Sequence, residues 1–190
     1  MKTRRFDIGL DFVLLLALCY LIDTQNLFFL ALFAAAMHEM GHVLAIWLCG
    51  AYIDRVELRA TGANIVLAPY PMLSYWQELF VAAAGPAAGL LAAWCFGLWQ
   101  NETCALLAGF SLLLSLFNLL PAAPLDGGRM LHACVMQAGG GAWICTAGNI
   151  AAACALAALC IAVCALAGIS PGLCAFCAFA TWSFFQKSSA

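Results

Sequence analysis

Residues 27–49 read LFFLALFAAAMHEMGHVLAIWLC, an apolar stretch that His38, Glu39 and His42 interrupt near its centre. Its length suits the hydrocarbon core of a membrane, which a helix of about 20 apolar residues crosses. Ionisable residues are costly at such a depth and usually mark a functional site. Two histidines four residues apart share one helix face and can bind one Zn²⁺, while the adjacent glutamate can act as general base on water. The stretch therefore predicts a membrane-spanning helix that carries a metal site.

The composition of the whole chain agrees with a membrane protein. Hydrophobic residues make up 66% of the chain and charged residues 8%, whereas soluble domains have about 25% charged residues. The net charge is -2 and the sequence contains no basic patch, so we expect no nucleic-acid partner. Most of the cysteines stand singly in apolar runs and are expected to be small core residues. The C-x-x-C of Cys174 and Cys177 has neither a second pair nor a nearby histidine, which disfavours a zinc or redox site there.

Six segments are apolar enough to be membrane helices, although some of them are short. The expected fold is an all-α polytopic membrane protein of about six transmembrane helices, in a single domain over residues 1–190. The segments run approximately over Ile8–Ile22, Leu27–Cys49, Tyr75–Trp99, Cys104–Leu120, Trp143–Gly168 and Gly172–Phe185.

All the positively charged residues fall on one side of this arrangement. They lie at the N-terminus, in the second and fourth connections and after the last segment: Lys2, Arg4, Arg5, Arg55, Arg59, Arg129 and Lys187. Lys and Arg accumulate in cytoplasmic loops of membrane proteins. We therefore expect both termini to lie in the cytoplasm.

The cytoplasmic connection Gly50–Pro71 has the pattern of strands. Apolar Val56 and Leu58 alternate with charged residues, Thr61-Gly62 interrupts, and a second apolar run follows from Ala63. This alternation predicts a β-hairpin with one apolar face. One interpretation is a small covering element at the membrane surface. The other is a strand edge that pairs with an extended substrate segment.

A catalytic zinc needs a third protein ligand and an open position for water. His132 is the one histidine left, and Asp126 stands out by its surroundings, NLLPAAPLDGGR over residues 118–129. Its two prolines and two glycines predict irregular backbone, which is tolerated at membrane depth only when it is buried in protein or lines a wet cavity. A carboxylate there can point at a metal just inside the cytoplasmic leaflet. His132 is expected to be a surface residue.

These two motifs, H-E-x-G-H on one helix and N-x-x-P-x-x-P-L-D-G-G-R on another, resemble the site-2 protease family of intramembrane zinc metalloproteases. The resemblance extends to the hairpin between the second and third helices and to Ala84-Gly85-Pro86 in the third. It implies that His38, His42 and Asp126 bind one Zn²⁺ per chain and that Glu39 activates water. It also implies that Asn118 holds the substrate or polarises its scissile carbonyl. The chain departs from the family pattern G-P-x-x-N at Gly89, where the asparagine would fall.

Within the family, the six-helix layout without a PDZ domain resembles stage IV sporulation protein FB. That resemblance implies a membrane-tethered protein substrate, such as a pro-sigma factor or another regulator, and a role in sporulation. It implies a bacterial cell membrane, or the membrane that surrounds the forespore, as the location. The chain ends soon after Phe185, so no CBS domain is expected. Partners beyond the lipid bilayer would be an inhibitory membrane protein or further copies of the chain.

Two other functional classes remain open. A membrane metal-binding or transport protein would explain His38 and His42, but it has no need for Glu39 between them. A non-catalytic scaffold for transmembrane partners would tolerate the loss of Asp126, whereas a protease would lose both zinc and activity.

Overall fold

The computed structural model describes residues 6–23, 27–59, 62–68, 72–123, 125–141 and 143–166. The chain divides into two compact units, Met1–Ser115 and Leu116–Ala190, with the division close to the end of α4. The elements, in chain order, are β1 (Phe6–Ile8), α1 (Leu10–Ile22), α2 (Leu27–Leu48), β2 (Ile53–Arg59), β3 (Gly62–Leu67), α3 (Tyr75–Gly97), α4 (Glu102–Asn118), α5 (Asp126–Gln137) and α6 (Trp143–Leu166).

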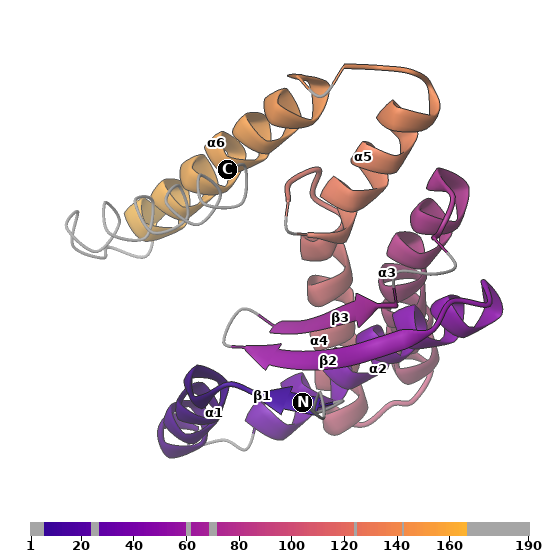
Figure 1. The fold of residues 1–190 in the computed structure, drawn as a ribbon. Coiled ribbons are helices and arrows are strands. Elements are labelled where there is room, and N and C mark those ends of the chain that lie inside the picture. The colour runs from indigo at the N-terminus through magenta and orange to yellow at the C-terminus, as the bar shows by residue number, and fades with distance from the viewer. Residues whose placement is uncertain are drawn as a thin grey trace. The chain divides into compact units, whose positions relative to one another are not determined.

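The first unit contains a three-stranded sheet in the order β1-β2-β3 (Figure 1). Strands β2 and β3 pair antiparallel from Arg59↔Gly62 at the turn to Ile53↔Leu67, which confirms the predicted hairpin. In the described sheet β3 is an edge strand, as the strand-edge interpretation requires. Strand β1 was not predicted: Ile8 pairs in parallel with Leu58 and does not begin the first helix.

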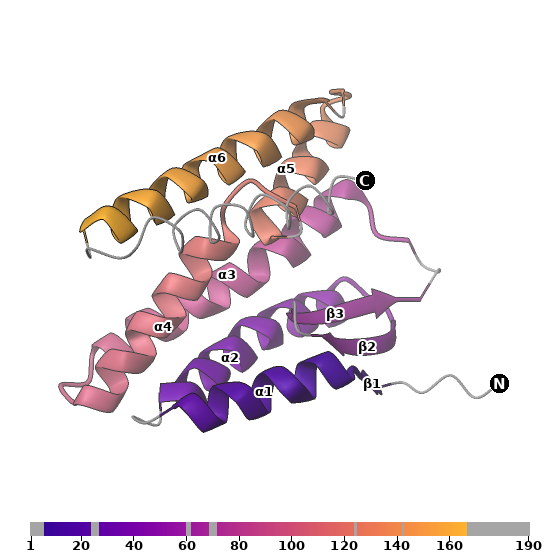
Figure 2. The same ribbon diagram turned by 90° about the vertical axis from the view of Figure 1, so that its left-hand side faces the viewer.

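The core of the first unit lies between α2, α3 and the hairpin, and α2 and α3 run side by side (Figure 2). Ala45 and Ile46 of α2 pack with Val81 of α3, all at most 3% exposed, and Leu67 of β3 covers them. A Cβ at Gly41 would lie only 2.7 Å from the Cβ of Ala88, so this glycine allows the two helices to approach closely. The α2–α3 pair is thus the scaffold on which the histidines sit.

Local signals set the ends of these helices. The Asp23 carboxylate accepts hydrogen bonds from the backbone N–H groups of Leu27 (3.0 Å) and Phe28 (2.8 Å), which would otherwise lack helical partners at the start of α2. Ser74 and Gln77 form a capping box at the start of α3. Gly50, with a φ of 71°, ends α2 in the left-handed conformation that glycine adopts without steric cost.

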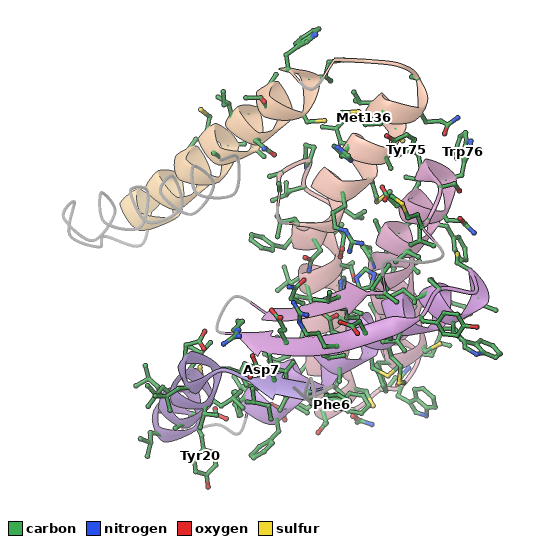
Figure 3. The ribbon with its side chains drawn as sticks, viewed as in Figure 1. Phe6, Asp7, Tyr20, Tyr75, Trp76 and Met136 are labelled. Atoms are coloured by element: carbon green, nitrogen blue, oxygen red, sulfur yellow. The ribbon has the colours of Figure 1, made fainter. Side chains whose placement is uncertain are left out.

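Among the residues that the structure describes, two helices, α2 and α3, are long and apolar enough to cross a membrane. Shorter apolar helical stretches lie in α1 (Leu10–Leu21), α4 (Glu102–Asn118) and the first part of α6 (Trp143–Ala155). Tyr75 and Trp76 lie at the first turn of α3 (Figure 3), where aromatic rings favour a membrane interface. Five of the six expected segments are helical, while the sixth segment and the C-x-x-C of Cys174 and Cys177 lie outside the described residues. The count of six membrane crossings stays a prediction.

The second unit contains a helix that the sequence did not suggest. Residues 126–137 form α5, where irregular backbone and connecting chain were expected. Helix α5 packs against α6. Ala122 and Leu125, from the turn before α5, form a small core with Ala152 and Ala153 of α6. Asp126 is therefore the first residue of a regular helix, at a position where irregular backbone was expected.

Candidate metal centre

His38 and His42 lie one turn apart on α2, and both side chains are buried, with exposed fractions of 3% and 5%. Their Nε2 atoms are 3.3 Å apart. Two ligand nitrogens at about 2.0–2.1 Å from a tetrahedral Zn²⁺ would be separated by roughly 3.3–3.4 Å. The spacing of the two rings therefore fits a single zinc ion that both nitrogens bind.

The orientation of the His42 ring is fixed by a neighbouring helix. Its Nδ1 lies 2.8 Å from the backbone carbonyl oxygen of Val81 on α3. A carbonyl can only accept, so Nδ1 must be the donor and the neutral ring keeps its lone pair on Nε2. Metal-binding histidines commonly donate their second ring N–H to a carbonyl in this way. The tautomer of His42, with its free lone pair on Nε2, therefore also fits a metal ligand.

Space for the His42 ring comes from Gly85, which follows Val81 by one helical turn on α3. A Cβ at position 85 would lie within 2.7 Å of three ring atoms, including Nε2 and Cε1. Gly85 belongs to the Ala84-Gly85-Pro86 motif of the sequence, and what packs against it is an imidazole ring. Neither Val81 nor Gly85 was identified as part of the site from the sequence.

Glu39 follows His38 directly on α2 and is half-buried. It therefore lies between the two histidines in the chain, on the same helix as both of them. A half-buried carboxylate beside a pair of candidate metal-binding histidines can reach water and still be shielded from bulk solvent, as a general base requires.

Asp126 opens α5 in the second unit and is 7% exposed. A carboxylate in the first turn of a helix is stabilised by the helix dipole. The Asp126 Oδ1 lies 3.6 Å from Arg129 Nη1, one turn later in the same helix, so the two side chains form an ion pair. Asn118 is the last residue of α4 and is half-buried, eight positions before Asp126 in the chain.

The turn between α4 and α5 folds back tightly on the start of α5. A Cβ at Gly127 would overlap the carbonyl oxygens of Leu119 and Leu120, and a Cβ at Gly128 would overlap the backbone of Ala122. The paired glycines after Asp126 are therefore required by close backbone approach. The turn is also held from α6, because the Asn149 Oδ1 accepts a hydrogen bond of 2.7 Å from the Ala123 N–H.

Two buried serines of α4 make a contact within their own helix: the Ser115 hydroxyl donates to the Ser111 carbonyl one turn earlier, at 2.7 Å. A Cβ at Gly89 would overlap the Ser115 hydroxyl, so the glycine that replaces the family asparagine makes room for α4. His132 is exposed on α5, as expected of a surface residue.

Comparison with known sequences gives matches to metalloproteases. Residues 97–163 match the profile of peptidase family M50, a range that contains Asn118 and Asp126 but not the histidine pair. A candidate zinc metalloprotease of Synechocystis sp. is 35% identical over 120 residues, 57% of this chain and 31% of that protein. One from Mycobacterium tuberculosis is 36% identical over 111 residues, 50% of this chain and 27% of that protein. A zinc metalloprotease of Methanocaldococcus jannaschii is 28% identical over 143 residues, 67% of this chain and 41% of that protein.

The matched regions thus span less than half the length of these curated relatives. Among solved structures, the site-2 protease from Methanocaldococcus jannaschii matches with a TM-score of 0.64 and 21% identity, over 100% of this chain and 94% of that one. At that identity the match shows a shared fold. The chain is thus similar over part of its length to peptidase family M50 and to curated zinc metalloproteases, and it shares a fold with the site-2 protease.

Proposed function

We propose that this chain is an intramembrane zinc metalloendopeptidase that cleaves a membrane-tethered protein near the cytoplasmic face of the bilayer. The observation that carries the proposal is the histidine pair: two buried Nε2 atoms 3.3 Å apart, beside Glu39, on a helix long enough to cross a membrane. The metalloprotease relatives support the same reaction class.

Three residues are proposed to hold the metal: His38 and His42 from α2, and Asp126 from the start of α5. Two imidazoles and a carboxylate, with one open position, are a ligand set found in zinc peptidases. Zinc, when bound, acts as a Lewis acid on the peptide carbonyl and lowers the pKa of water to about 7. The support for Asp126 is its burial at a helix start and its place in the second motif.

Glu39 is proposed to transfer the proton in this reaction. Its carboxylate would take a proton from the attacking water and pass it to the departing amine nitrogen as the C–N bond breaks. One water is consumed, and a new carboxyl and a new amine terminus result. Asn118 is proposed to hold the substrate backbone beside the scissile bond.

The proposed substrate is a membrane-tethered protein segment with helix breakers near the cut, because a helical peptide bond is shielded by its own turn. A pro-sigma factor, and with it a role in sporulation, is the finer proposal. It rests on the subgroup resemblance of the sequence.

The test compares Glu39→Gln with wild type in cells that carry a reporter tethered by one transmembrane segment with a Gly-Pro break. Wild type should release the reporter, and Glu39→Gln should reduce release by at least about 100-fold, the lower range for general acid–base catalysis. Glu102→Gln, at an exposed position in the first turn of α4, is the matched control and should cleave normally.

Zinc content separates this proposal from its main rival. Glu39→Gln should retain zinc, because the glutamate is not among the proposed ligands. Equal release by wild type and Glu39→Gln would rule out the protease mechanism. A transport protein would instead move zinc across proteoliposome membranes, with or without Glu39.

A further inference from the structure

Helix α3 carries three glycines whose surroundings differ sharply. A Cβ at Gly97 would have nothing within 4 Å, and a Cβ at Gly89 would meet chiefly the Ser115 hydroxyl. A Cβ at Gly85 would instead overlap the His42 ring at Nε2, Cε1 and Cδ2. Only one glycine of this series therefore lies against a proposed metal ligand.

The same part of α3 also binds the other side of that ring. The Val81 carbonyl accepts a hydrogen bond from His42 Nδ1 at 2.8 Å, and position 85 lies one helical turn further along. Side chains on a helix point back over the preceding turn, so a side chain at 85 would cover the approach to the Val81 carbonyl. The missing side chain is what lets the ring reach that carbonyl.

We propose that Gly85 is a positioning residue for His42: its missing side chain lets the imidazole donate Nδ1–H to the Val81 carbonyl and so present the Nε2 lone pair to the metal. The inference rests on the proposed function, in which His42 is a zinc ligand. The ring has little room to give way, because His42 is 5% exposed and Val81 is 1% exposed. A methyl group at 85 would force the ring to rotate or the two helices to separate.

The first measurement is zinc affinity of the purified full chain in detergent, by competition with a chelator. Gly85→Ala should weaken zinc binding by about 10- to 100-fold, the usual cost of removing a group that orients a metal ligand. Alanine favours a helix more than glycine does, so a loss would not come from a weakened α3. Gly97→Ala should bind zinc like wild type, because its methyl group enters open space.

Gly89→Ala is the second control. It crowds the α3–α4 packing one turn away from Gly85 and touches a hydroxyl at the end of a short side chain. It should keep zinc affinity close to wild type. An equal loss in Gly89→Ala and Gly85→Ala would mean that general packing of α3 is responsible, and it would overturn the proposal.

The second measurement reports the tautomer of His42 without metal and without activity. The chain has 3 histidines, so ¹⁵N-histidine NMR in a His132→Gln background leaves two rings to assign. At a pH of about 8, where ordinary imidazoles are neutral, His42 of the wild type should carry its proton on Nδ1. In Gly85→Ala that preference should be lost.

Unchanged affinity in Gly85→Ala, or reduced affinity with the Nδ1–H tautomer retained, would each overturn the proposal. Neither measurement depends on cleavage. A wild type that binds zinc and shows these effects but cuts no tethered reporter would therefore sink the proposed function alone.

Discussion

His42 shows how one residue is prepared for metal binding by a helix distant in the chain. Its partner Val81 lies 39 residues away. The pairing of His38 with His42 was predictable, because a spacing of four residues places both on one helix face whatever the tertiary fold. The carbonyl and the gap at Gly85 were not predictable, because they depend on how α2 and α3 rotate against each other. The Ala84-Gly85-Pro86 motif of the sequence did not indicate which side chain would pack against its glycine.

The third ligand can be tested at the same scale. Asp126→Asn keeps the size of the side chain and removes the anionic oxygen, so zinc should bind at least about 10- to 100-fold more weakly than in wild type, the cost of losing even a group that only supports a ligand. The measurement is metal content by mass spectrometry after dialysis against a chelator. Asp54→Asn, at an exposed carboxylate of β2, should retain one zinc per chain. Full zinc retention by Asp126→Asn would remove Asp126 from the ligand set.

At the scale of elements, local patterns predicted the helices and the hairpin, while contacts between distant segments were missed. Strands β2 and β3 were predictable because alternation and the Thr61-Gly62 break lie within one short stretch. Strand β1 has three residues and gains its partner only through the parallel pairing with β2. Helix α5 was missed because Gly127 and Gly128 disfavour a helix locally, although the backbone contacts of the turn require them.

The hairpin carries a charge pair with a pH signature. Arg55 Nε donates to Glu57 Oε1 at 2.7 Å, and this hydrogen bond, helped by the charge of Arg55, holds the pKa of Glu57 below its ordinary value. Because the folded pKa is lowered, the stabilisation is present above the ordinary carboxyl pKa of about 4.3 and is lost as the pH falls through the lowered pKa of Glu57.

Arg55→Met should therefore raise the pKa of Glu57 back toward its ordinary value, which a ¹³C NMR titration of the Glu57 carboxyl group would measure. Asp54→Asn removes a neighbouring charge on the same strand but keeps the Arg55–Glu57 hydrogen bond, so the pKa of Glu57 should stay low. The same titration midpoint in Arg55→Met and wild type would show that Arg55 is not the cause.

At the scale of the whole molecule, the sheet constrains how the first unit can sit in a membrane. Phe6–Ile8 pair with Val56–Leu58, the Arg59 guanidinium bonds Asp7 at 2.7 Å, and Gly9 N–H donates to the Leu58 carbonyl. The strand before α1 and the strand after α2 are therefore joined in one sheet. If α2 crosses a membrane, β1 and the hairpin must therefore lie on the same side of it.

If α2 crosses the bilayer, its ends lie on opposite faces, and the chain between β1 and α2 must cross as well. Helix α1 is the described element available for that crossing, and its 13 residues span about 20 Å at 1.5 Å per residue. A bilayer core is about 30 Å thick, so we expect α1 to cross where the bilayer is thinned or where flanking residues reach to the interface.

Two epitope tags test this topology: one at the N-terminus and one between Gln100 and Asn101, at the exposed connection after α3. With α1, α2 and α3 all crossing, added protease should remove the N-terminal tag only from inverted vesicles and the second tag only from intact spheroplasts. A cytoplasmic marker protein serves as the control for membrane integrity. If α2 and α3 cross and α1 does not, the two tags lie on the same face and disappear together. That result would contradict the crossing by α1 and would also require β1 to leave the sheet, because the hairpin would then lie on the opposite face from the N-terminus.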